Sequence, residues 1–97
     1  MQNIPNHIAP ALVEALLSIN TQEECVAFLD DLCTVVELQA LSQRWEVVRL
    51  LDAGKTYAEI AEATSASTAT ISRINRCLSY GSARGYRTVL DGLKAKK

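Results

Sequence analysis

Two arginines three residues apart, Arg73 and Arg76, have the chemistry to bind nucleic acid. A guanidinium group donates paired hydrogen bonds to a guanine edge or to a phosphate. On a helix over residues 68–80, both would lie opposite the apolar Ile71 and Leu78. The small side chains beside the arginines would permit a close approach to a major groove. This face comprises Thr68, Ala69, Ser72, Arg73, Arg76 and Tyr80.

An ordinary amphipathic helix with a solvated arginine face would show the same pattern, so the preceding segment matters. Thr56 and Glu59 have the spacing of a capping box and predict the start of a short helix. A break follows, in which Ser65 stands where many such turns have glycine, and Ser67 or Thr68 can begin a second helix. Residues 56–80 therefore predict a helix-turn-helix, which favours DNA binding.

The rest of the chain must position this unit, and its periodicity is helical. Capping boxes at Thr21 and Thr34, each with Glu three residues later, predict two helix starts. Gly54 is typical of the residue just after a helix, and Gly81 is a plausible stop for the second helix of the unit. No stretch predicts a strand, so we expect an all-α fold with about six helices. The other expected helices are Pro10 to about Asn20, one from Thr21 carrying Leu32, Val35 to about Ala53, and 86–93.

Length and composition indicate one domain that associates with a second copy. A chain of 97 residues has a thin core on its own, and its 48% hydrophobic content is generous for so small a monomer. A homodimer sharing its core would bury the surplus, and two recognition helices could read two half-sites. We divide residues 1–97 into a flexible arm at 1–9, dimerisation helices at 10–53, the helix-turn-helix at 56–80, the final helix at 86–93 and a basic tail at 94–97.

The net charge of −1 conceals two oppositely charged segments. Residues 1–66 hold ten acidic and three basic side chains, whereas residues 67–97 hold seven basic and one acidic. Phosphate binding depends on where positive charge lies more than on the total. The distribution therefore permits nucleic-acid binding, although a basic tail can also be only a solvated end.

Other residue types point away from catalysis, metals and membranes. Cys25, Cys33 and Cys77 lack CxxC spacing, and with the single His7 they predict no metal site. We expect the three thiols to be reduced and buried in a cytoplasmic protein. No Ser/His/Asp set or glycine-rich phosphate loop is present, so we expect no enzyme and no cofactor. No apolar run approaches membrane length, and no secretory signal is apparent.

From Thr34 onwards the sequence resembles the Trp repressor superfamily, in particular its small YerC/YecD-type members. The resemblance rests on ELQALSQRWEVVRLLDAG and on TATISR within the helix-turn-helix. It implies an intertwined homodimer that binds double-stranded DNA. It also places Ala69 and Ser72 at base-contacting positions. The first helix of the unit, beginning at Thr56, and the turn, ending at Ser67, would contact phosphates.

The resemblance also implies a possible effector pocket. Arg44 and Arg73 match two arginines that line the tryptophan site of Trp repressor, and Thr70 matches a small pocket residue. Ile74 stands where the repressor has glycine, and Cys77 stands where it has serine. A branched side chain at that point argues against tryptophan as the ligand. It leaves open another small-molecule corepressor that would contact Arg44, Thr70, Arg73 and Cys77.

Together these features predict a sequence-specific DNA-binding transcriptional regulator. We expect a homodimeric repressor that acts on a palindromic operator. The alternative is a protein-interaction module that keeps the helix-turn-helix shape without binding DNA. That alternative is favoured by the acidic first two-thirds of the chain, since Glu59 and Glu62 would repel phosphates from the first helix of the unit.

Overall fold

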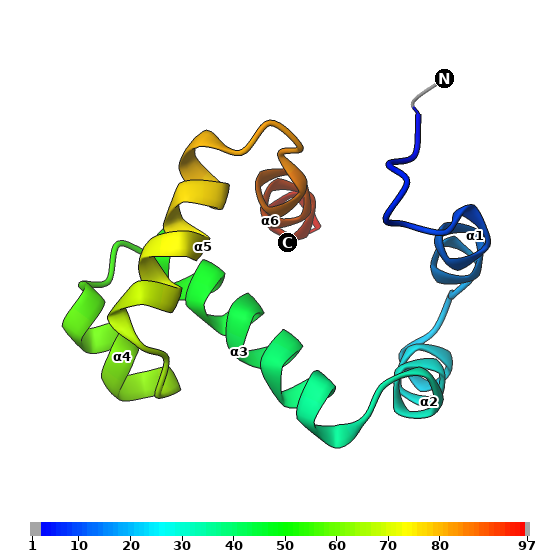
Figure 1. The fold of residues 1–97 in the computed structure, drawn as a ribbon, viewed down its shortest axis with the longest axis horizontal. Helices are drawn as coiled ribbons and strands as arrows, with labels where there is room; N and C mark the ends of the chain where they lie inside the picture. The colour runs from blue at the N-terminus through cyan, green and yellow to red at the C-terminus, as the bar shows by residue number, and fades with distance from the viewer. Residues whose placement is uncertain (1–2, 97) are drawn as a thin grey trace. The chain divides into compact units, whose positions relative to one another are not determined.

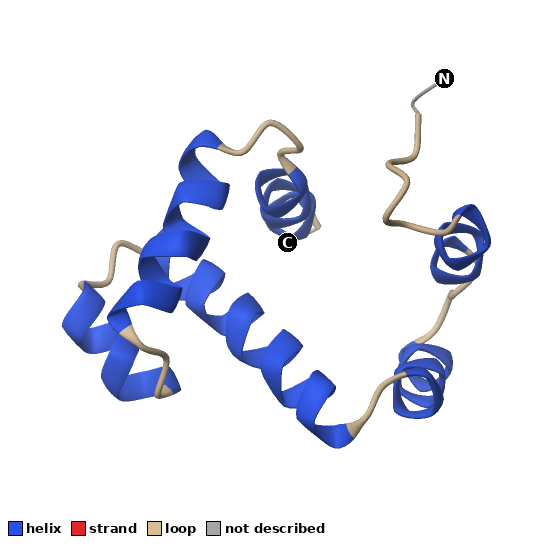
Figure 2. Ribbon diagram, viewed as in Figure 1, coloured by secondary structure: helices blue, strands red, loops and turns tan. Residues whose placement is uncertain are grey.

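The computed structural model describes residues 3–96, which fold into six α-helices without a strand among them (Figures 1 and 2). The expected all-α class and helix order are confirmed. The helices are α1 (Pro10–Leu17), α2 (Gln22–Leu32), α3 (Val35–Asp52), α4 (Tyr57–Thr64), α5 (Thr68–Tyr80) and α6 (Gly85–Ala95).

Local capping accounts for most helix starts. At Thr34 the backbone N–H donates to Glu37 Oε1 at 2.8 Å, and the Glu37 N–H donates to Thr34 Oγ1 at 3.1 Å. This reciprocal pair satisfies two N–H groups that have no partner inside the helix. At Thr21 only half of the expected box forms. Glu24 donates its N–H to Thr21 Oγ1, but its carboxylate accepts from the N–H of Asn20 instead.

Two helix boundaries differ from the sequence expectation. The first helix ends at Leu17, not near Asn20, because Ser18 closes the last turn. The Ser18 hydroxyl donates to the Ala15 carbonyl at 2.7 Å and occupies an acceptor at the helix end. The last helix extends to Ala95, beyond the expected residue 93.

The end of α3 is a Schellman motif at Gly54, as the glycine predicts. The Gly54 N–H donates to the Leu51 carbonyl and the Lys55 N–H to the Leu50 carbonyl, each at 3.0 Å. Gly54 has φ +83°, a conformation that glycine adopts without steric cost. The motif turns the chain from α3 into the helix-turn-helix within four residues.

The chain divides into two compact units, and the first ends at Leu38. It contains α1, α2 and the first residues of α3. Residues 3–9 are not helical and include one turn, in which the Ile8 N–H donates to the Pro5 carbonyl. Residues 1–2 of the expected arm and Lys97 of the expected tail lie outside the described part. No side chain between residues 3 and 38 is buried, and Leu17 is 79% exposed.

The second unit begins at Gln39 and has its own apolar core. Each of its helices contributes at least one buried side chain, and α5 contacts both α4 and α6 (Figure 1). The Trp45 and Tyr86 rings pack at its margin with centroids 6.4 Å apart. The buried set is Val47, Val48, Ile60, Ala66, Ile71, Ile74 and Leu90.

Ion pairs attach α6 to the end of α3. Asp52 accepts from Lys94 Nζ at 2.8 Å and from Arg87 Nη1 at 3.1 Å. The hydrogen bond from Lys94, helped by that from Arg87, holds the pKa of the Asp52 carboxyl below its ordinary value. Lys94, expected in a basic tail, is therefore a structured residue of α6.

Candidate nucleic-acid interface

The first helix of the helix-turn-helix begins at a complete capping box. The Thr56 N–H donates to Glu59 Oε1 at 2.8 Å, and the Glu59 N–H donates to Thr56 Oγ1 at 3.1 Å. The backbone hydrogen bond from Thr56 is the main cause that lowers the pKa of Glu59. The Thr56 side chain is exposed but already engaged in the cap.

The turn between α4 and α5 is held without glycine. Ser65 adopts the left-handed conformation with φ +63° and ψ 12°, at the position where the sequence lacks the usual glycine. A side chain in this region costs free energy relative to glycine. The Ser65 N–H donates to the Ala61 carbonyl at 2.8 Å, and Ala66 is buried in the core. Three residues, 65–67, thus connect the two helices.

Ser67 caps α5, the second helix of the helix-turn-helix. Its Oγ accepts from the Thr70 N–H at 3.1 Å. Ile71 and Ile74 face the core and are buried, as their spacing predicts, and Leu78 packs against the same core. Burial of this inner face therefore determines which side chains of α5 point away from the core.

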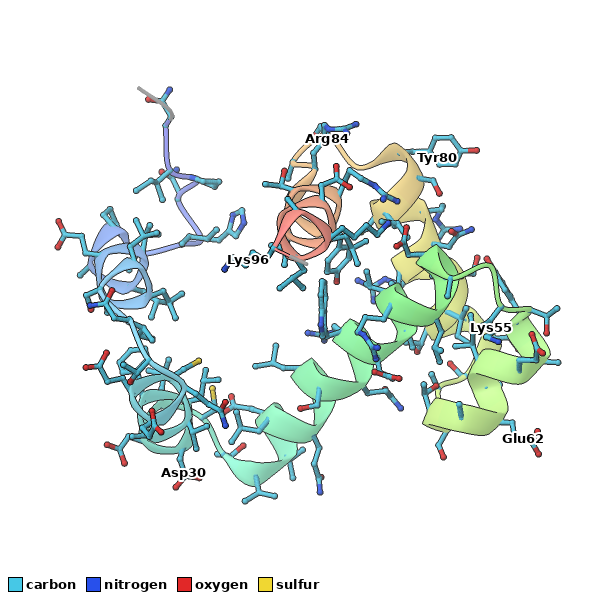
Figure 3. The ribbon with its side chains drawn as sticks, turned by 180° about the vertical axis from the view of Figure 1, so that it is seen from behind. Asp30, Lys55, Glu62, Tyr80, Arg84 and Lys96 are labelled. Atoms are coloured by element: carbon cyan, nitrogen blue, oxygen red, sulfur yellow. The ribbon has the colours of Figure 1, made fainter. Side chains whose placement is uncertain are left out.

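The structure exposes seven of the eight residues predicted to bind DNA, and Ser72 is half-buried. Tyr80 is 85% exposed and projects from the C-terminal end of α5, the end opposite Thr68 (Figure 3). The seven are Thr56, Ser67, Thr68, Ala69, Arg73, Arg76 and Tyr80. Their part in DNA binding stays a prediction.

Charge pairing divides the basic residues into two groups. Arg87 pairs with Asp52 and Asp91, Lys94 pairs with Asp52, and Arg49 pairs with Glu46. Within residues 3–96, neither Arg73 nor Arg76 forms an ion pair or a side-chain hydrogen bond. The number of basic side chains free to meet a phosphate is therefore smaller than the number in the sequence. Two of the free ones, Arg73 and Arg76, lie on α5.

A pocket of about 180 Å³ lies beside the same helix. It brings together all four residues of the predicted effector site and adds two more. Arg73 belongs both to this pocket and to the outer face of α5. Ile74, only 6% exposed, is a core residue whose edge reaches the pocket. The lining residues are Arg44, Thr70, Arg73, Ile74, Cys77 and Tyr86.

The cysteine prediction was wrong in one respect. Cys77 is exposed at the pocket, and Cys25 and Cys33 are only half-buried, so none of the three is a core residue of the single chain. Cys77 follows Arg76 on the edge of α5 between the inner and outer faces, which explains its exposure. All three are free thiols. No helix in the described range is long and apolar enough to cross a membrane.

Sequence reasoning missed several residues that shape the site. Lys55 is exposed directly before the Thr56 cap and so adds positive charge at the start of α4 (Figure 3). The position of Lys55 directly before a capping box could have indicated from the sequence that it lies at the start of a helix. Gln43 donates to the Thr64 carbonyl at 3.0 Å, and Asn75 donates to the Tyr57 hydroxyl at 3.1 Å. No sequence pattern reveals these two contacts, because the partners are 21 and 18 residues apart.

Comparison with known proteins agrees with this arrangement. The chain matches the family described as Trp repressor protein over residues 9–94. It is 52% identical to YerC of Bacillus subtilis over 83 residues, which are 86% of this chain and 79% of YerC. A solved TrpR-like protein from Eubacterium eligens superimposes with a TM-score of 0.80 at 48% identity, covering 87% of this chain and 86% of the other.

A second solved structure, from Staphylococcus aureus, gives the same TM-score at 46% identity and covers 87% of this chain and 83% of the other. The matched regions contain both the capped helix-turn-helix and the long helix before it. With the family match extending over most of the helices, the chain belongs to the Trp repressor family of regulators.

Proposed function

We propose that this protein is a sequence-specific DNA-binding repressor that acts as a homodimer on a palindromic operator. The observation that carries the proposal is that Arg73 and Arg76 are exposed, and have no ion-pair partner in the described part of the chain, on a helix whose opposite side is anchored in the core. Repression would follow from occlusion, because recognition helices in successive major grooves exclude polymerase. Action on DNA implies a cytoplasmic protein.

The chemistry of the α5 face suits base reading. Thr68 and Ala69 at its N-terminal end are small and exposed, so the helix can enter a groove about 12 Å wide. Arg73 and Arg76 follow one and two turns later and can reach base edges or phosphates. The exposed Lys55 and the N-terminus of α4 supply further phosphate-binding potential.

The dimer proposal rests on apolar surface that the single chain leaves uncovered. The first compact unit buries none of its described side chains, and large apolar side chains in it are exposed, such as Val36 at 73% and Val26 at 60%. Exposed apolar side chains of this number are costly in a soluble monomer. A second copy that covers them would also supply the second recognition helix. The two half-sites would then lie about 34 Å apart.

The pocket is proposed as an effector site for a small anionic molecule. Arg44 and Arg73 supply two positive charges from different helices, and Thr70 supplies a hydroxyl. Because Ile74 occupies part of the space, tryptophan is a poor fit and DNA binding need not require it. An effector held by Arg73 would change the position of an arginine on the outer face of α5, which is the proposed reading face.

A protein-interaction module is the second candidate. The exposed carboxylate of Glu62 on α4 favours it, since that charge opposes phosphate approach (Figure 3). Glu59 weighs less in this direction, because its carboxylate is engaged by Thr56 at the helix start. The same duplex-binding experiment separates the two functions.

The test is selection of bound duplexes from a random pool at moderate salt, with and without a mixture of amino acids. We expect a palindromic motif without added ligand, with half-sites about one helical turn apart. A motif that appears only with the mixture would make the pocket a required corepressor site. No enrichment in either condition, with no duplex bound at low salt, would favour the interaction module.

A further inference from the structure

We infer that Gln43 is a positioning residue for DNA reading, through a hydrogen bond that fixes the helix-turn-helix turn on α3. The inference rests on the proposed function. The side-chain amide of Gln43 donates to the main-chain carbonyl of Thr64 at 3.0 Å in a half-buried contact. In the part of the chain that the structure describes, no other α3 side chain hydrogen bonds to turn residues 64–67.

The acceptor of this bond lies at the junction of α4 and the turn. The Thr64 carbonyl belongs to the last turn of α4, where carbonyls lack a partner inside the helix. The Thr64 hydroxyl donates to the Ile60 carbonyl at 2.7 Å and accepts from the Ala66 N–H at 3.2 Å. Gln43 therefore holds a residue that is bonded both to α4 and to the turn.

The rest of the turn has little freedom to absorb a displacement. Ser65 is held in the left-handed conformation by its N–H bond to the Ala61 carbonyl. Ala66 is 5% exposed and belongs to the core. Ser67 then caps α5 through the Thr70 N–H. A shift of the Thr64 carbonyl relative to α3 would thus be passed on to the N-terminus of α5.

This N-terminus carries the small residues, Thr68 and Ala69, proposed to approach base edges. Base-edge contacts need side chains placed to about 0.5 Å, whereas attraction to phosphates depends on charge and tolerates larger displacements. Loss of the Gln43 bond should therefore weaken discrimination between sequences more than it weakens general DNA binding. This distinguishes a positioning role from a purely structural one.

The test compares Gln43→Met with Gln39→Met. Methionine has nearly the length of glutamine but no donor. Gln39 lies one turn earlier on α3, is exposed, and makes no side-chain hydrogen bond within residues 3–96. For Gln43→Met we expect roughly fivefold weaker binding to the selected duplex, the scale of one lost hydrogen bond. Binding to a random duplex should change by less than about twofold.

Amide hydrogen exchange of the free protein provides an independent readout. Exchange at Ala66 and at the first amides of α5 should be faster in Gln43→Met and unchanged in Gln39→Met. Equal losses on both duplexes, or unaltered exchange in the turn, would overturn the role of Gln43. If the wild-type chain selects no duplex, the proposed function fails, and the exchange data alone decide whether Gln43 holds the turn.

Discussion

The side-chain amide of Asn75 on α5 donates a hydrogen bond to the hydroxyl of Tyr57 on α4, with 3.1 Å between nitrogen and oxygen. Asn75 Oδ1 also accepts from the Ser79 hydroxyl at 3.3 Å, one turn further along α5. Both Tyr57 and Asn75 are half-buried. The bond links the two helices of the helix-turn-helix, and so helps to set which side of α5, including Arg76, faces outward.

Removal of this bond should destabilise the second unit without changing its outer surface. For Tyr57→Phe we expect the free energy of unfolding to fall by about 1 kcal/mol, because Asn75 loses a half-buried partner. Urea denaturation followed by circular dichroism measures the change. Tyr80→Phe is the matched control, since the Tyr80 hydroxyl is exposed and should contribute nothing. Equal stability of the two variants would contradict the proposed link.

Loss of one reading-face arginine should weaken DNA binding and its dependence on salt. For Arg76→Ala we expect the slope of log affinity against log salt to become shallower by about one, if the guanidinium contacts a phosphate. A contact to guanine would instead cost about 1–3 kcal/mol and relax preference at one base pair. Arg73→Ala should act similarly.

Fluorescence anisotropy across a salt series distinguishes these cases. Arg49→Ala serves as the control, because Arg49 is paired with Glu46 on α3 and its charge is already neutralised. Unchanged affinity and salt dependence in both Arg73→Ala and Arg76→Ala would exclude the proposed reading face.

Glycine at the turn should stabilise the protein. Ser65 has φ +63°, and Ser65→Gly removes the steric cost of a side chain in that region. The greater freedom of glycine in the unfolded chain offsets part of the gain, which leaves about 0.5–1 kcal/mol. Thermal unfolding should show a higher Tm for Ser65→Gly. It should show no rise in Tm for Ser82→Gly, because Ser82 itself does not have a positive φ. A lower Tm for Ser65→Gly would show that its backbone is not strained.

The Asp52 ion pairs should make stability depend on acid pH. Because the folded-state pKa of Asp52 is lowered, first by Lys94, its contribution is present above the unfolded-state value near 4 and is lost as pH falls below it. Wild type should therefore be more stable than Asp52→Asn at neutral pH, and the difference should shrink below about pH 4.

Urea titrations from pH 7 to pH 3 measure this difference. Asp30→Asn is the control, because Asp30 is exposed and forms no ion pair among residues 3–96. A stability difference between wild type and Asp52→Asn that does not vary with pH would show that the carboxylate charge does not contribute.

Features that depend on neighbours along the chain were predictable from the sequence. The Thr34–Glu37 and Thr56–Glu59 boxes form because their partners are three residues apart on one helical turn. Gly54 ends α3 because it alone of its neighbours adopts positive φ without cost. Ile71 and Ile74 are buried because helical periodicity places them on the same side. These local rules sufficed for the all-α class and the helix-turn-helix.

The candidate site was predicted in part, and the reason is again the range of the interactions. The four expected pocket residues do meet, and three of them come from α5 itself. Tyr86, which completes the pocket from α6, left no pattern near the others. The prediction that Cys77 is buried was wrong, because the exposure of a side chain at a helix edge depends on what packs against that edge.

What the sequence alone determined is therefore the set of helices, their caps and the composition of the α5 face. Only the tertiary structure decided which charges remain available. Arg87 and Lys94 pair with Asp52, which lies 35 and 42 residues earlier, and Arg87 also pairs with Asp91, whereas Arg76 has no ion-pair partner within residues 3–96. It also decided that Gln43 reaches Thr64. Such contacts depend on how helices pack in three dimensions, and short-range propensities carry no information about partners so far apart in the chain.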